Sequence, residues 1–184
     1  GTSMCYPVSS MGSHVSVVPN HQLNRKTPLH TRANVAYFGT FGYELDLNKL
    51  SYEEISEVKQ QIAFMKEYRE LIQFGTFYRL KSPFEGNETA WMTVSEDKKT
   101  ALVFWYRERN VVNADFTRVR LQGLDPDFIY RNEYNGTENY GDELMNLGLL
   151  TTDCTAGEPT SEDAPCTDYE SRIYVLTTVA RIPS

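Results

Sequence analysis

Long hydrophobic runs, a leader peptide and cysteine motifs are all missing from this 184-residue sequence. Its apolar stretches are only a few residues long, far below the roughly 20 needed to cross a bilayer, so we expect no transmembrane helix. The first residues contain neither the basic nor the apolar region of a signal peptide. These absences predict a cytoplasmic protein. Because the sequence also starts without Met, we expect it to be cut from a longer protein.

Basic residues are scarce outside the first 50 positions. The formal net charge is -7, and residues 1–50 alone carry a balance of +2, which leaves -9 for residues 51–184. Binding to phosphates needs clustered Lys and Arg, so this acidic body argues against nucleic acid and anionic membranes as partners. With 40% hydrophobic and 12% aromatic residues, the chain still has the material for a folded core.

Cysteine is also rare, and its three positions follow no motif. They are Cys5, Cys154 and Cys166, an odd number without a CxxC spacing. This pattern argues against a disulfide framework and against a zinc ribbon. Cys154 and Cys166 are able to pair across the acidic segment 151–168, but without a secretion signal we expect reduced thiols.

All three histidines, His14, His21 and His30, fall within seventeen residues of one another. Their irregular spacing matches no short metal motif, so we predict no metal site and no cofactor. The polar loop that contains them favours a pocket for a sugar or another small molecule. Four of its side chains are candidate binding residues: His14, Asn20, His21 and Gln22. The alternative is that these imidazoles and amides only satisfy backbone groups of the loop.

The clearest predicted element is a helix from about residue 52 to residue 74. Ser51 and Glu54 form a capping box at its start, and Gly75 stands where a left-handed C-cap belongs. Apolar residues recur along it at spacings of three and four: Ile55, Val58, Ile62, Met65, Tyr68 and Ile72. This pattern predicts one buried stripe and an opposite face in solvent.

Upstream of this helix, short strands are expected at 3–7 and 34–38, joined by the polar loop 9–32. This order is typical of a βα piece of a parallel sheet, with too few strands to close its own core. Downstream, strands are expected at 76–81, 90–95, 101–109, 118–121, 129–133 and 171–180. The turn clusters at 95–99 and 123–127 indicate hairpins, and the whole pattern predicts an antiparallel sandwich of about 100 residues.

Catalytic groups cannot be assigned from the residues alone. The G-x-S-x-G nucleophile motif is absent. Glycoside hydrolysis requires a pair of carboxylates, and four acids have a motif-like context: Glu85, Glu88, Asp142 and Glu143. They lie beside turn residues, where roles in turns or interfaces are favoured.

Several blocks of sequence, in order, resemble the α-galactosidases of glycoside hydrolase family 36. They are MGSHVS (11–16), VPNHQ (18–22), RANVA (32–36), GTFGYELDL (39–47), AWMTVS (90–95), GLDP (123–126) and GDELMN (141–146). The resemblance implies an α/β plus all-β fold: residues 1–75 are the last strands and helix of a (β/α)8 barrel, and residues 76–184 are a C-terminal antiparallel β-sandwich.

The resemblance also implies an activity for the complete parent protein. Family members cleave terminal α-1,6-linked galactose, as in melibiose and raffinose, with retention. Their two catalytic aspartates stand in Lys-Trp-Asp and Ser-Asp-Asp motifs, and this chain contains neither motif. The resemblance therefore places both aspartates upstream, so no catalytic residue is assigned here and the chain alone is expected to be inactive.

The implied partners are an α-galactoside oligosaccharide, the upstream barrel of the same parent and further copies in a homo-oligomer. A second hypothesis stays open at this point. In it the chain is a stand-alone β-sandwich module for carbohydrate binding or assembly, and residues 1–75 are an adjunct. The coding sequence before Gly1 distinguishes the two hypotheses.

Overall fold

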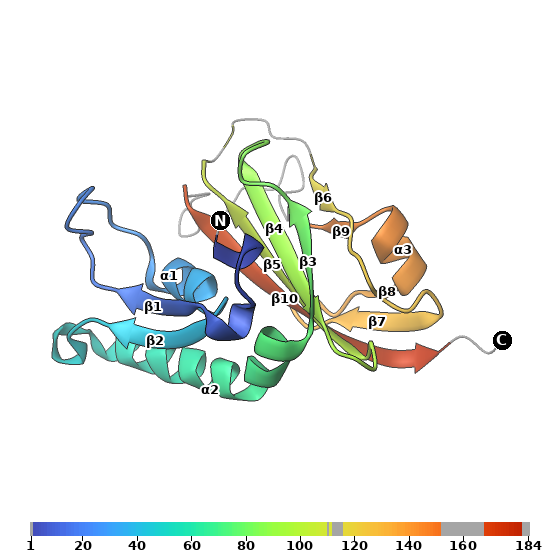
Figure 1. Ribbon diagram of the computed structural model, residues 1–184, viewed down its shortest axis with the longest axis horizontal. Coiled ribbons are helices and arrows are strands. Elements are labelled where there is room, and N and C mark those ends of the chain that lie inside the picture. Colours follow the sequence, from blue (N-terminus) through green and yellow to red (C-terminus); the bar gives the residue numbers. More distant parts are fainter. Residues whose placement is uncertain (1, 110, 112–115, 152–167, 182–184) are drawn as a thin grey trace. The chain divides into compact units, whose positions relative to one another are not determined.

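The computed structural model describes residues 2–109, 111, 116–151 and 168–181 (Figure 1). They form two compact units, Gly1–Gly75 and Thr76–Ser184. Residues 152–167, which include Cys154 and Cys166, lie outside the described residues. The prediction that these two thiols are reduced therefore stays a prediction. Cys5 is an exposed free cysteine. None of the helices in the described ranges combines the length and apolar character that a membrane span requires.

The first unit is a two-stranded parallel sheet with helices (Figure 1). Its elements in chain order are η1 (Thr2–Met4), η2 (Val8–Ser10), β1 (Gly12–Ser16), α1 (Leu29–Ala36), β2 (Thr40–Glu44), η3 (Leu47–Lys49) and α2 (Tyr52–Phe74). The pairing of β1 with β2 places Gly12 opposite Thr40 and Ser16 opposite Glu44. The expected βα texture is therefore present, but its strands are not where the sequence placed them.

The expected strand at 34–38 is wrong, because this segment belongs mostly to α1 and the turn that follows it. Pro28 precedes the first turn of α1, where its missing N–H costs nothing. Leu29, Ala33 and Ala36 are buried along the helix, at spacings of four and three residues. That spacing is helical, and the local apolar run concealed it.

The first strand, β1, lies inside the segment that was expected to be a polar loop, and residues 3–7 are not a strand. Only Val15 of β1 is buried, with 0% of its surface exposed. A strand of five residues with a single buried side chain carries almost no alternation of apolar and polar residues, so its sequence reads as a loop.

Helix α2 begins with the predicted capping box. The Glu54 N–H donates to Ser51 Oγ at 3.2 Å, and the Ser51 N–H donates to the Glu54 carboxylate at 2.8 Å. The predicted left-handed C-cap is wrong: Gly75 has φ -65° and ψ 164°, which is extended backbone. Glycine is therefore not required there, and the chain continues directly into β3 (Thr76–Lys81).

The buried stripe of α2 is rotated relative to the expected one. Val58, Met65 and Ile72 are buried as predicted, but Gln61 is buried too, while Ile62 is only half-buried. The Gln61 side chain accepts a hydrogen bond from the Tyr43 hydroxyl at 2.7 Å and donates one to Glu57 at 2.8 Å. The oxygen and the nitrogen of this amide both have hydrogen-bond partners. Burying the side chain therefore leaves no polar group unpaired.

The second unit is built on a six-stranded antiparallel sheet with the order β3-β4-β5-β10-β7-β8. The remaining elements are β4 (Glu88–Val94), β5 (Thr100–Arg107), β6 (Arg118–Val119), β7 (Phe128–Asn132), β8 (Glu138–Tyr140), α3 (Gly141–Asn146), β9 (Leu149–Leu150) and β10 (Glu170–Arg181). All six expected strands occur. The sequence did not predict β8, β9 or α3, since each is too short to show a period.

The core of the second unit lies between this sheet and a smaller layer made of α3 and the β6–β9 pair. Met92, Val103 and Trp105 point into it from the large sheet, and Leu121 and Leu144 point into it from the other layer. The two layers make the predicted antiparallel sandwich. The turn at 95–99 is the expected hairpin between β4 and β5. The turn at 123–127 instead connects β6 to β7, which belong to different sheets.

Gly141 is required where α3 approaches the turn before β7. A Cβ at this position would lie 2.0 Å from the Asp125 carbonyl oxygen, which is backbone and cannot swing away. Gly86, in contrast, has nothing within 4 Å of its Cβ position. The close approach of the Asp125 carbonyl explains why glycine stands at position 141. The backbone conformation there does not itself require glycine.

The burial pattern of α2 gives a first prediction. Ile72→Ala should lower the free energy of unfolding by about 3 kcal/mol, because Ile72 is 1% exposed and its removal leaves a cavity. Ile62→Ala should cost clearly less, since Ile62 is half-buried beside a groove. Urea titrations of both variants measure the difference. Equal losses would contradict the observed rotation of the stripe.

The contact at Gly141 gives a second prediction. Gly141→Ala should destabilise the second unit by about 2 kcal/mol through overpacking against the Asp125 carbonyl. Gly86→Ala is the matched control and should change the thermal midpoint little. If calorimetry gives Gly141→Ala the same thermal midpoint as the unsubstituted chain, the backbone around Asp125 moves aside and the prediction is wrong.

Candidate functional site

The two faces of the β1–β2 sheet have different surroundings. On one face, the Ser13 hydroxyl donates to the Ala36 carbonyl of α1 at 2.5 Å, and the Tyr43 hydroxyl reaches Gln61 of α2. The opposite face carries small or polar residues: Gly12, His14, Ser16, Thr40, Gly42 and Glu44. In a (β/α)8 barrel the helices lie outside the strands, so this second face is the one that a barrel turns inward.

His14 and Glu44 meet on this second face. The distance between His14 Nε2 and Glu44 Oε2 is 2.5 Å, and the two side chains are 52% and 73% exposed. His14 lies in the middle of β1 and Glu44 at the carboxyl end of β2. A contact this exposed adds little to the free energy of unfolding, about 0–1 kcal/mol. The contact instead orients the imidazole, which stands on the second face in the middle of β1.

In the sequence, Glu44 occurs only as part of the family-like block 39–47 and is not connected with His14. The residues are 30 positions apart, and only the parallel register brings them together. The predicted strands at 3–7 and 34–38 contain neither residue, so the sequence carried no usable signal for this pairing. Without the correct strand positions, their pairing could not be derived.

The other candidate binding residues belong to the loop after β1. The Asn20 side-chain oxygen accepts hydrogen bonds from the Gln22 and Leu23 N–H groups, both at 3.0 Å. This amide therefore stabilises its own turn. His21 and Gln22 are exposed on that turn, and His30 is exposed on α1. The structure brings His14 to Glu44, and it does not join His14 to the three loop residues.

Arg32 of α1 holds this loop against the strand. Its guanidinium donates to the Ser16 carbonyl at 2.6 Å and to the Thr27 carbonyl at 3.0 Å. Burial lowers the pKa of Arg32 from its usual value, and Glu54 and Glu57 oppose this shift. A cavity of about 130 Å³ adjoins these residues and Asn20. It is smaller than the roughly 300 Å³ at which ligand pockets begin, so it is a gap within the loop and not a sugar site.

A larger groove lies between β2 and α2. It measures about 430 Å³, and Phe41, Tyr43 and Met65 form its apolar wall while Lys66 and Arg69 stand at its side. Among the described strands, β2 pairs only with β1, so its other edge is open at this groove. Burial, followed by the charge of Glu57, raises the pKa of Tyr43 to about 12, which keeps its phenol protonated as a donor. The groove therefore lies beside an edge of β2 that has no strand partner among the described residues.

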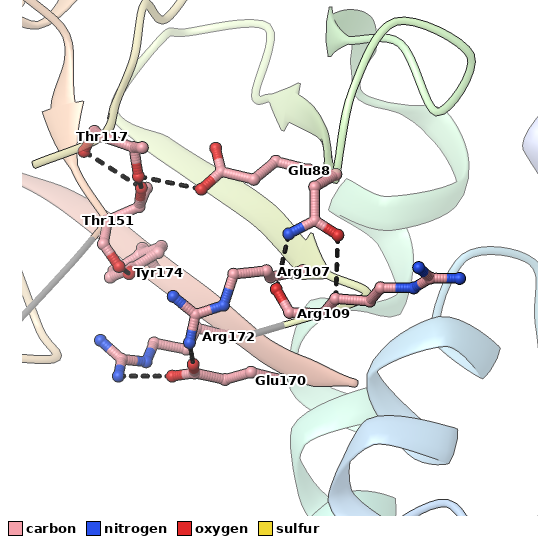
Figure 2. A network of polar contacts seen from close by, with 9 residues as sticks. Glu88, Arg107, Arg109, Thr117, Thr151, Glu170, Arg172 and Tyr174 are labelled. Atoms are coloured by element: carbon pink, nitrogen blue, oxygen red, sulfur yellow. Dashed lines mark hydrogen bonds and ion pairs between the residues drawn. The ribbon is translucent and has the colours of Figure 1, made fainter. Parts of the chain in front are cut away.

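Acids of the second unit are engaged in a separate polar network (Figure 2). Register places Glu88 of β4 and Glu170 of β10 on either side of Arg107 of β5. Glu170 bridges Arg107 and Arg172, with 2.7 Å to the latter. These side chains are largely buried and mutually paired, which is the condition under which charges are tolerated inside a protein.

The same network ties the β6–β9 layer to the sheet (Figure 2). The Thr117 hydroxyl donates to Glu88 at 2.9 Å and lies 3.0 Å from the hydroxyl of Thr151. Glu88 also pairs with Lys81. Asp142, another acid with a motif-like context, accepts from the Glu143 N–H at 2.7 Å in the first turn of α3. These carboxylates have structural partners and do not face each other across an open site.

Potential metal ligands do not cluster in the ranges that the structure describes. Within them, no group of three or more His, Cys, Asp and Glu side chains is arranged to hold a metal ion. His14 has a single carboxylate neighbour, and His21 and His30 are separate from it. His14 and Glu44 give this face an imidazole and a carboxylate, both of which form hydrogen bonds.

Comparison with known families matches nearly the whole chain. Residues 1–75 match the family described as Melibiase, and residues 88–176 match the glycosyl hydrolase family 36 C-terminal domain. The α-galactosidase AgaA of Geobacillus stearothermophilus is 54% identical over 81% of this chain. The bifunctional α-galactosidase/sucrose kinase AgaSK of Mediterraneibacter gnavus is 48% identical over the same share.

Solved structures give the same result. The crystal structure of the Geobacillus stearothermophilus enzyme AgaA superposes with a TM-score of 0.87 over 97% of this chain, at 47% identity. The α-galactosidase of Lactobacillus brevis superposes with a TM-score of 0.88 over the full chain, at 42% identity. The chain covers only 20% of the Geobacillus sequence and 24% of the Lactobacillus brevis structure. Its fold is thus the end of a (β/α)8 barrel followed by an antiparallel β-sandwich, and the chain belongs to glycoside hydrolase family 36.

Proposed function

We propose that this chain is the C-terminal part of a retaining α-galactosidase that hydrolyses terminal α-1,6-linked galactose from melibiose- and raffinose-type oligosaccharides. The observation that carries the proposal is the similarity to α-galactosidases over both units, at 54% identity in one relative. Structures of the Geobacillus relative are titled as complexes with raffinose and with stachyose. Both are α-galactosides, which supports this class of substrate.

Residues 1–75 supply the last strands and the last helix of the catalytic barrel in this proposal, and residues 76–184 form the C-terminal sandwich. Active sites of such barrels lie at the carboxyl ends of the strands. His14 stands on the inward face in the middle of β1, and Asn20, His21 and Gln22 follow in the loop after the carboxyl end of this strand. We assign substrate contacts to these four residues and no catalytic residue to this chain.

The two catalytic carboxylates come from the upstream part of the barrel. A retaining site needs a nucleophile and an acid/base about 5–5.5 Å apart. Glu88 and Glu170 are committed to buried ion pairs, and Glu44 is paired with His14. The family's aspartate motifs are absent from the sequence. The chain's own contribution is therefore to complete the barrel and to bind hydroxyl groups of the substrate.

The upstream barrel is accordingly the first partner of this chain. It covers the inward face of β1 and β2 and adds a strand at the open edge of β2, beside the groove of about 430 Å³. We further propose a cytoplasmic homo-oligomer, with exposed apolar side chains such as Phe84 and Leu147 as candidate contacts. A stand-alone sandwich module is disfavoured, because residues 1–75 also match the Melibiase family.

The proposal predicts that the isolated chain is inactive and that a completed barrel is active. The purified 184-residue chain should not release chromophore from a nitrophenyl α-galactoside above the background without protein. A chimera in which this chain replaces the matching segment of the 54% identical Geobacillus enzyme should hydrolyse the same substrate.

Two results would count against the proposal. One is turnover by the isolated chain after its mass confirms that no longer protein is present. The other is a chimera that is folded by circular dichroism and calorimetry yet inactive. The unmodified Geobacillus enzyme, expressed and assayed in parallel, controls for the assay.

A further inference from the structure

The pairing of His14 with Glu44 determines which imidazole nitrogen remains available. Nε2 lies 2.5 Å from a carboxylate oxygen, and a carboxylate only accepts hydrogen bonds. The imidazole proton therefore sits on Nε2. In the neutral ring this leaves Nδ1 with a free lone pair, so Nδ1 is an acceptor for a donor from outside the pair.

The space around His14 is open to a ligand. Its register partner on β2 is Gly42, and a Cβ built at Gly42 would meet nothing within 4 Å. The same holds for Gly12, which lies two residues before His14 on the same face. Glycine at both positions removes the side chains that would otherwise fill the barrel interior next to the imidazole. The ring therefore stands beside two positions that carry no side chain.

The pair also changes character when the barrel is complete. As seen here, both side chains face water, which weakens their attraction. On the inward face of a closed barrel they are shielded, and the same contact becomes a strong constraint on the ring. Few charged groups of β1 and the packed α1 face His14 and Glu44. The guanidinium of Arg32 on α1 is bound to the Ser16 and Thr27 carbonyls and not to this pair.

We propose that Glu44 is a positioning residue for sugar binding: it holds His14 with its proton on Nε2, so that His14 Nδ1 accepts a hydrogen bond from a hydroxyl group of the α-galactoside. The inference rests on the proposed function, because it requires the site to receive a sugar. It adds a residue outside the four contacts assigned above, and it gives a role to each nitrogen of the imidazole. Glu44 itself does not touch the substrate.

A double-mutant cycle in the active chimera tests this coupling. His14→Ala and Glu44→Leu should each raise KM about tenfold while kcat changes less than twofold, since the lost hydrogen bond acts equally before and in the transition state. Because Glu44 acts through His14, the double variant should be no worse than His14→Ala alone. Glu44→Gln keeps an acceptor oxygen and should raise KM only about threefold. Glu67→Gln, an exposed acid on α2, is the matched control and should change nothing.

Losses that multiply in the double variant would overturn the inference while leaving the proposed function intact. A fall in kcat at constant KM, or an equal effect of Glu67→Gln, would do the same. A folded chimera that is inactive before any substitution overturns the proposed function and the inference together.

A second measurement uses the folded chimera, in which the barrel is complete, and needs no activity. In a ¹⁵N-labelled sample at pH 8, the long-range imidazole pattern of His14 should be that of the Nε2-protonated form. Glu44→Leu should shift the pattern toward a mixture of both forms, and Glu67→Gln should not. An unchanged pattern in Glu44→Leu would show that the carboxylate does not set the proton position, and would overturn the inference whatever the kinetics show.

Discussion

The parallel register of β1 with β2 is the constraint on which the first unit depends. It sends Val15 and Tyr43 toward the helices and His14 and Glu44 to the opposite face. Helices therefore cover one side of the sheet, and the other side keeps small and polar residues that no single pair of strands can bury. A shift of one residue would exchange the two faces, placing His14 against α1 and Val15 in solvent. The register is held by side-chain bonds to backbone carbonyls, of Ser13 to Ala36 and of Arg32 to Ser16.

The second unit is arranged in the opposite manner, because it closes its own core. Its sheet is covered by α3 and the β6–β9 pair. At one end of this sandwich, charged residues form ion pairs with one another. Glu88, Arg107 and Glu170 occupy one row across three strands, so each strand contributes one charge to the row. A module of this kind folds around its own contacts. The first unit, in contrast, leaves one face of its two-stranded sheet exposed, and strands from elsewhere cover this face in the proposed barrel.

The sequence was informative where a pattern is local and long. The capping box of Ser51 and Glu54 and the 23-residue helix that follows could be predicted, because both depend on spacing along the chain. The strands of the sandwich were found for the same reason. Short elements such as β1, with one buried residue, could not be found, and α1 was mistaken for a strand. The meeting of His14 with Glu44 depends on pairing between strands that are 30 residues apart, and the burial of Gln61 depends on a hydroxyl from another element. No local spacing contains that information.

The groove beside β2 has a basic side formed by Lys66 and Arg69 on α2, three residues apart on one helix face. An unpaired strand edge usually invites the same edge of another copy. Here two copies that met edge to edge would bring four cations together in the joint, and like charges at such distance repel. An incoming segment with carboxylates meets no such barrier. The two cations thus oppose pairing of this edge with the same edge of a second copy and leave it open to a segment that carries carboxylates.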